Sequence, residues 1–161
     1  MKVNVDMSKV VPAESIKGGD GDETKGLHEF LQEAQAYISS FSWVAGVKRA
    51  YFGLGIAKIV GVFLFEITPS RDDVDEKIWV IVGDLPPAYI TVEDAPNPAT
   101  ALDEYIGAMQ SWVEAAKAGQ PIDGLIPVNV PPSPENGARL ESRLQFLDTE
   151  ILSGYAADLA D

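Results

Sequence analysis

The segment Gly83–Tyr89 (GDLPPAY) carries the strongest candidate functional site of this sequence. Asp84 follows an apolar run typical of a buried strand, and two prolines stiffen the chain directly after it. An acidic side chain at this point either accepts hydrogen bonds from backbone amides of the turn or faces a pocket together with Tyr89. We expect the capping role. The candidate binding residues are Asp84, Pro86, Pro87 and Tyr89.

Two other segments resemble ligand-binding loops without meeting their requirements. Gly53–Lys58 (GLGIAK) lacks the G-x-x-x-x-G-K-[ST] pattern of a phosphate-binding loop, so we interpret its glycines as a hairpin turn. Asp20–Glu23 (DGDE) has the spacing of the first calcium-loop ligands. However, Lys25 stands where such a loop needs glycine, and Leu31 stands where it needs glutamate. We therefore predict neither a bound phosphate cofactor nor a calcium ion.

His28 is the only histidine, and one histidine is enough for a catalytic triad. No G-x-S-x-G nucleophile motif accompanies it. A metal site would need carboxylates as its remaining ligands, because the chain contains no cysteine. Pairs of adjacent acids are more typical of solvated loops and helix starts than of catalytic pairs; they are Asp72/Asp73, Glu93/Asp94 and Asp103/Glu104. We name no catalytic residue, metal ligand or cofactor.

Acidic charge dominates the second half of the chain. Residues 1–83 contain 12 acidic and 9 basic residues, whereas residues 84–161 contain 13 acidic and 3 basic ones. The net charge of −13 repels phosphate, which argues against nucleic acids and anionic membranes as partners. A basic protein partner fits this charge, although solubility alone would also explain it.

Length and composition indicate one globular domain. The chain has 161 residues, of which 46% are apolar and 23% charged. The longest apolar stretch, Tyr51–Phe65, is interrupted by Lys58 and is too short for a membrane span, and the N-terminus lacks the apolar segment of a signal peptide. We expect a cytoplasmic protein with a mobile arm over residues 1–23 and a single domain over residues 24–161.

Apolar spacing and capping residues predict three helices. The apolar stripe of the first runs over Leu27–Phe41, with a start near Thr24. The second follows Asn97-Pro98, a capping residue with proline at the first helical position, and ends at Gly119. Ser133 caps the third helix in the same way.

Apolar runs between the first two helices predict a sheet with strands at Val47–Phe52, Ile56–Ile67 and Ile78–Val82, and a short fourth strand at Tyr89–Val92. Residues 59–65 and 78–82 are apolar at every position, so both faces should be covered. The connections are too short for helical crossovers. The expected fold class is α+β, with a three- to four-stranded antiparallel sheet packed with three helices.

The run Trp79–Ile90 (WVIVGDLPPAYI), followed by Asn97-Pro98, Ala101 and Trp112, resembles the W-x-[IV]-x-G-D-L-P-x-x-Y-[IL] signature of a small bacterial family of unknown function. The similarity covers about residues 77–152 and rests on this one motif, because the N-terminal half departs from the family pattern. The resemblance implies a bacterial source and one intact domain. It implies no activity.

Two function classes follow from these observations. The first, which we prefer, is a non-enzymatic acidic protein-binding or regulatory protein of the bacterial cytoplasm, a class that includes toxin-immunity proteins. It would hold its partner with an acidic helical face or with the segment Asp84–Tyr89. The second is an enzyme or small-ligand binder with a pocket near Asp84 and Tyr89, lined also by Glu66 or His28. Converging polar groups in a pocket would favour the second class.

Overall fold

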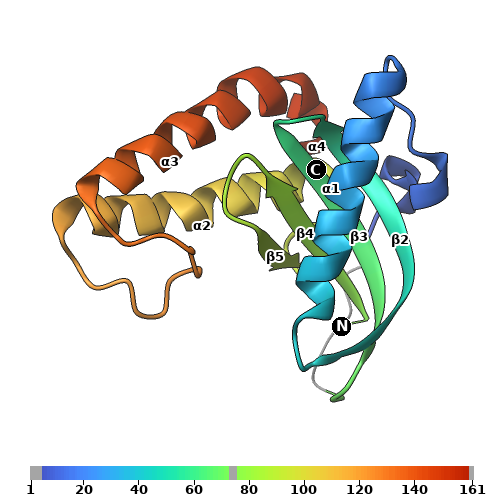
Figure 1. The fold of residues 1–161 in the computed structure, drawn as a ribbon, viewed down its shortest axis with the longest axis horizontal. Helices are drawn as coiled ribbons and strands as arrows, with labels where there is room; N and C mark the ends of the chain where they lie inside the picture. The colour runs from blue at the N-terminus through green and yellow to red at the C-terminus, as the bar shows by residue number, and fades with distance from the viewer. Residues whose placement is uncertain (1–4, 73–75, 160–161) are drawn as a thin grey trace.

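The computed structural model describes residues 5–72 and 76–159, which form three layers (Figure 1). A five-stranded antiparallel sheet in the order β1-β2-β3-β4-β5 lies in the middle. Helix α1 (Gly21–Ser39) covers one face, and α2 (Pro98–Ala118) packs on the other. Helix α3 (Pro134–Phe146) packs mainly along α2. The predicted α+β class is confirmed, with one strand more than expected.

The strands are β1 (Val11–Pro12), β2 (Val44–Ile56), β3 (Val60–Pro69), β4 (Lys77–Gly83) and β5 (Ala88–Thr91). The additional strand is β1, which pairs with the outer edge of β2. Two residues are too few to leave an alternating pattern in the sequence, and a proline in a strand is confined to an edge, so β1 could not be recognised beforehand.

Residues 5–16 pack against the body of the protein, where we expected part of a mobile arm. Val5 and Val10 are buried in the core on the α2 side of the sheet, and Ile16 is buried on the α1 side. Residues 1–4 lie outside the described part of the chain. We predicted a mobile arm because residues 17–23 are rich in glycine. The apolar residues that precede them, among residues 5–16, nevertheless bury enough surface to hold that part of the chain against the body of the protein.

The hairpin between β2 and β3 turns around Lys58, which has a φ of 68°. The turn that we predicted at Gly53–Gly55 was therefore wrong, because β2 continues through both glycines. A Cβ at Gly53 would lie 2.6 Å from Cγ of Pro98, at the start of α2. Glycine is needed here for close packing of helix and sheet, and the register of β2 against β3 shifts at this point as in a β-bulge.

Strands β3 and β4 are buried on both faces, as their continuous apolar runs predicted. Alternate residues face opposite cores. The α2-side set is Val62, Leu64, Trp79 and Ile81, and the α1-side set is Phe63, Phe65, Val80 and Val82. Nε1 of Trp79 donates to the carbonyl oxygen of Ala95 at 2.8 Å, which satisfies a buried donor. These contacts fix the end of β4, where the candidate segment begins.

Both predicted caps of the later helices are confirmed. Asn97 accepts a hydrogen bond from the backbone N–H of Thr100 at 2.9 Å, and Gly119 ends α2 in the left-handed conformation. Ser133 accepts from the backbone N–H of Asn136 at 3.1 Å at the start of α3. Within the described ranges, no helix is both long and apolar enough to cross a membrane.

Candidate functional site

Asp84 leaves the sheet directly after β4. Its backbone N–H donates to the carbonyl oxygen of Ile59 at 3.0 Å, which ties the turn to the β2–β3 hairpin. The preceding Gly83 has a φ of 151°, and a Cβ at this position would collide with the same carbonyl oxygen. The conformation therefore requires glycine, and it directs the chain away from the sheet edge.

The carboxylate of Asp84 accepts a hydrogen bond from Nε of Arg143 on α3 at 3.3 Å. Among the described residues this is its partner, in place of the backbone amides that we expected. The side chains of Asp84 and Arg143 are 70% and 45% exposed, so the ion pair is screened by solvent and contributes little to stability. Its structural effect is to link the turn after β4 with α3.

Tyr89 lies on the face of the sheet that α1 covers. Its ring contacts Phe41 and Trp43, with centroid distances of 5.3 and 5.1 Å. Strand β5 alternates, so Ala88 and Ile90 face the α2-side core while Tyr89 faces the α1 side. The structure therefore does not bring Asp84 and Tyr89 into one of the cavities that the described residues form.

Tyr89 instead lines a cavity of about 240 Å³ together with Tyr37 and residues 124–127 of the loop after α2. Burial raises the pKa of Tyr37 to about 12, and the neighbouring Tyr89 hydroxyl adds to this shift. The neutral phenol is therefore favoured. The cavity is lined mainly by apolar and aromatic groups, and it lies apart from Asp84.

The two prolines of the segment have different positions. The carbonyl oxygen of Pro86 accepts a hydrogen bond from the hydroxyl of Tyr105 on α2 at 2.5 Å. Burial raises the pKa of Tyr105, so this hydroxyl remains a donor. Pro87 is half-buried and does not line the cavities described here. Pro86 thus anchors the turn after β4 onto α2 and keeps Asp84 and Leu85 beside α3.

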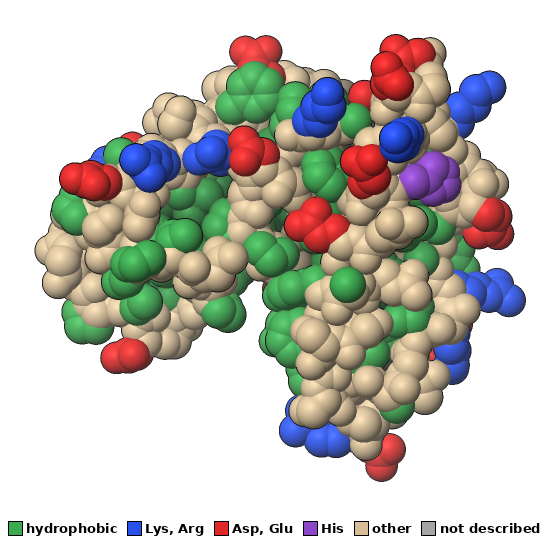
Figure 2. Space-filling model, viewed as in Figure 1, with side chains coloured by type: hydrophobic (Ala, Val, Ile, Leu, Met, Phe, Trp, Pro, Cys, Tyr) green, Lys and Arg blue, Asp and Glu red, His purple; other side chains and the backbone are tan. Residues whose placement is uncertain are grey.

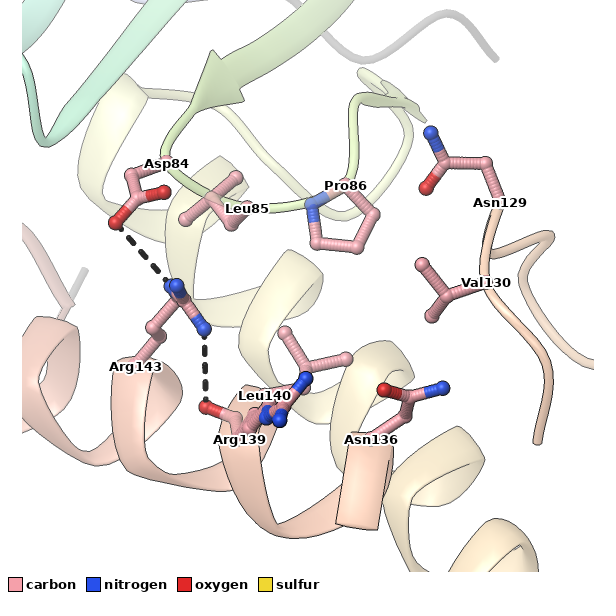
Figure 3. Close-up of a pocket in the computed structure, with 9 residues that line it drawn as sticks. All are labelled: Asp84, Leu85, Pro86, Asn129, Val130, Asn136, Arg139, Leu140 and Arg143. Carbon is pink, nitrogen blue, oxygen red and sulfur yellow. Dashed lines mark hydrogen bonds and ion pairs between the residues drawn. The ribbon is translucent and has the colours of Figure 1, made fainter. Parts of the chain in front are cut away.

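Two cavities share Asp84, Leu85 and Arg143 in their lining, and together they form what we call the α3 groove; Figure 3 shows the first of them. The first has a volume of about 300 Å³ and is lined by Asp84, Leu85, Pro86, Asn129, Val130, Asn136, Arg139, Leu140 and Arg143. The second has a volume of about 260 Å³ and is lined by Lys58, Ile59, Asp84, Leu85, Ser142, Arg143, Phe146 and Leu147. Figure 3 shows the turn after β4 on one side and α3 on the other.

The charges that line the groove have the opposite balance to the whole chain. Lys58, Arg139 and Arg143 face a single acid, Asp84, although the chain has a net charge of −13. Figure 2 shows Lys and Arg side chains over α3, beside hydrophobic side chains. Among the described residues, the Arg139 guanidinium has no hydrogen-bond or ion-pair partner.

Apolar side chains lie at both ends of the groove. Val130 at one end is 41% exposed, and Phe146 at the other is 44% exposed. Between them Leu85 and Leu140 form part of the lining. The helix rises about 1.5 Å per residue, so the groove extends for about 15 Å along α3. This length matches about five residues of extended chain.

The sequence contained an indirect sign of this site. Arg139 and Arg143 are two of the three basic residues among residues 84–161, and their spacing of four places them on one face of a helix. We did not identify them because a surface arginine in a helix is common, and nothing in the local sequence indicated that the turn at Asp84 would lie opposite.

Glu66 and His28 are distant from this groove. Glu66 pairs with Lys77 at the start of β4, whereas Asp84 follows the end of that strand. His28 lies on α1, on the other face of the sheet. Neither residue lines the groove, so the arrangement that we considered for an enzyme pocket is not formed by the described residues.

The acids of Asp20–Glu23 have structural roles. The carboxylate of Asp20 accepts a hydrogen bond from the backbone N–H of Glu23 at 2.8 Å and caps α1, which therefore begins at Gly21 rather than near Thr24. The carboxylate of Glu23 accepts from the backbone N–H of Ala57 at 2.8 Å. In the described ranges no group of three or more potential ligands is arranged to hold a metal ion.

Comparisons of the chain with protein-family models, with curated proteins and with solved structures found no match. The similarity of residues 77–152 to a bacterial family remains a hypothesis that rests on the motif around Asp84. In the structure this motif comprises β4, the turn that lines the α3 groove, and β5.

Proposed function

We propose that this chain is a non-enzymatic binding protein of the bacterial cytoplasm that holds an extended segment of a partner protein in the α3 groove. The observation that supports this proposal is the pair of adjoining cavities, with half-exposed Val130 and Phe146 at the two ends. Apolar side chains of the partner would occupy these ends, since a few buried anchors supply most of the binding energy in protein interfaces.

The walls of the groove are fixed before binding. The Tyr105–Pro86 hydrogen bond holds the turn, and the cap at Ser133 holds the start of α3. Nδ2 of Asn136 also donates to the carbonyl oxygen of Pro131 at 2.9 Å, which fixes the end of the loop that carries Val130. A preformed groove loses little conformational entropy when a segment binds, and this favours affinity.

A partner of basic overall charge is part of the proposal. The net charge of −13 attracts such a partner over distances beyond the groove and speeds their encounter. One acidic cluster lies near the start of α2, where burial and then the charges of Asp94 and Asp103 raise the pKa of Glu104. Toxin-immunity proteins are one example of the class of acidic binding proteins that we propose here.

A second candidate function is the binding of a small ligand. The first cavity has a volume of about 300 Å³, at the lower end of the range for such sites, and two arginines and two asparagines converge on it. We place this function second because the cavity continues into its neighbour past an exposed ion pair, which suits a chain more than a compact molecule.

A selection of random peptides tests the proposed function. Displayed short peptides are selected on the wild-type protein, and the affinity of each selected peptide is then measured in solution. Ser142→Trp places a large side chain in the second cavity. Gln145→Trp is the matched control, because Gln145 lies on the same helix and does not line either cavity.

We expect Ser142→Trp to weaken binding by about tenfold or more, corresponding to about 1.4 kcal/mol, and Gln145→Trp to have no effect. Circular dichroism verifies that both variants are folded. Failure to select any peptide on folded wild-type protein would contradict the proposed function. Equal affinities for wild type and Ser142→Trp would contradict it as well.

A further inference from the structure

We infer that the α3 groove binds an acidic side chain of the partner segment, held between Arg139 and Arg143. This inference rests on the binding function proposed above, and it adds the chemistry of the residue that is bound. It differs from the overall charge of the partner, because the groove and the outer surface of the protein carry opposite charges.

Arg139 and Arg143 both line the first cavity. They are one helical turn apart, and Nη1 of Arg143 donates to the carbonyl oxygen of Arg139 at 3.4 Å (Figure 3). Arg143 also donates through Nε to Asp84. The guanidinium of Arg139 has no hydrogen-bond or ion-pair partner among the described residues. A planar guanidinium with free donors is suited to bind a carboxylate through two parallel hydrogen bonds.

Asp84 demonstrates that a carboxylate can reach this arginine pair from the turn side of the groove. The contact at 3.3 Å is long for a charge-assisted hydrogen bond; the side chain of Asp84 is largely exposed and that of Arg143 is about half-exposed. A carboxylate of the partner would find Arg139 unoccupied and would share the field of Arg143. A cationic side chain would instead meet Lys58, Arg139 and Arg143 against a single acid.

The amide groups at one end of the groove complete the site. Asn129 and Asn136 line the first cavity with Arg139, and they provide neutral donors and acceptors for the backbone of an extended segment. Leu85 and Leu140 line the same cavity and provide apolar surface beside them. An acidic residue flanked by apolar residues therefore matches the order of groups along the groove.

Two displayed peptide libraries test the inference. They are identical except that the central position is fixed as Glu in one and as Gln in the other. We expect peptides to be enriched from the Glu library, and their affinity to fall about tenfold when Glu is replaced by Gln. Arg139→Gln should lower the affinity for Glu peptides by a similar factor and should leave the affinity for the corresponding Gln peptides unchanged.

Arg49→Gln is the matched control, because it removes the same charge from β2 at the end of the sheet opposite Asp84. It should leave both affinities unchanged. Equal enrichment of the two libraries, with no effect of Arg139→Gln, would overturn the inference that an acidic side chain is bound. The proposal that the groove binds a peptide segment would still stand. Enrichment from neither library on folded protein would overturn groove binding itself.

Discussion

The ion pair of Asp84 and Arg143 joins two segments that are 59 residues apart in the chain. It lies at the surface, where water and salt weaken the attraction between the charges. A partner can therefore replace Asp84 on the arginine at small cost. We interpret Asp84 as a group that competes with the partner's acidic residue, rather than as one that holds the partner.

This interpretation gives a prediction for Asp84→Asn. The free energy of unfolding should change by less than about 1 kcal/mol, because the ion pair is exposed. Affinity for Glu-centred groove peptides should rise severalfold, because Arg143 is released for binding. Urea denaturation and fluorescence anisotropy measure the two quantities. A fall in affinity would show that the Asp84 carboxylate itself contacts the partner.

Tyr37 gives a prediction on pH dependence. Burial raises its pKa from 10.0 to about 12, so the unfolded chain loses this proton at lower pH than the folded protein does. The resulting stability is complete below pH 10 and is lost as the pH rises toward about 12. The free energy of unfolding should therefore decrease across this interval, with Tyr105, whose pKa is also raised, contributing in the same direction.

Denaturation at a series of alkaline pH values measures this effect in wild type and in Tyr37→Phe. The variant has no hydroxyl to titrate, so its stability should decrease less steeply with pH. Identical pH profiles for the two proteins would contradict the assignment of the shift to Tyr37.

At the scale of elements, strands β3 and β4 were predictable because they are apolar at every position, and this pattern occurs where both faces are covered. The caps at Asn97 and Ser133 were predictable because each is followed by proline. The turn at Gly53–Gly55 was wrong because glycine serves close packing as well as turns, and the sequence does not distinguish these uses.

The site was predictable only in part, for a reason of topology. Asp84 and Pro86 were recognised from a local pattern and do line the groove. Arg139 and Arg143 were not, because their position opposite Asp84 depends on how α3 returns along α2. Tyr89 was assigned to the same pocket, but its position in β5 directs it to the other face of the sheet.

Substitutions of Phe63 and Phe146 distinguish effects on stability from effects on peptide binding. Phe63 is fully buried in β3, so Phe63→Ala should lower the free energy of unfolding by about 3–5 kcal/mol. Phe146 is half-exposed at the end of the groove, so Phe146→Ala should lower the free energy of unfolding by only about 1 kcal/mol, while the affinity for groove peptides should fall. Denaturant unfolding and peptide titration test both variants. A loss below about 1 kcal/mol for Phe63→Ala would mean that β3 is peripheral.

At the scale of the whole molecule, a chain with a net charge of −13 has a groove lined by three basic residues and one acid. Under the proposed function, the net charge would act at long range and affect the rate of encounter, whereas the groove would act in contact and affect the lifetime of the complex. A partner with a basic body and one acidic residue in its docking segment would satisfy both. This combination also disfavours nucleic acids, since the phosphates would be repelled before reaching the arginines.

Reversing the acids Asp103, Glu104 and Glu114 to lysine tests the role of the surface. A groove peptide extended by a tail of lysines should associate more slowly with this variant, and the salt dependence of the association rate should become weaker. Dissociation should remain unchanged, because these residues do not line the groove. Stopped-flow fluorescence measures both rates. An unchanged association rate would leave solubility as the explanation of the acidity.

The α3 groove as the binding site is tested most directly by mapping a selected peptide onto the protein with backbone amide chemical shifts. We predict that the largest shift changes on binding occur at Asp84–Leu85, at Asn129–Val130 and along α3. The amide of Tyr89 should change little, because its ring packs on Phe41 and Trp43 on the α1 side of the sheet. Large changes at Tyr89 or at the start of α2, with the groove unaffected, would contradict the account.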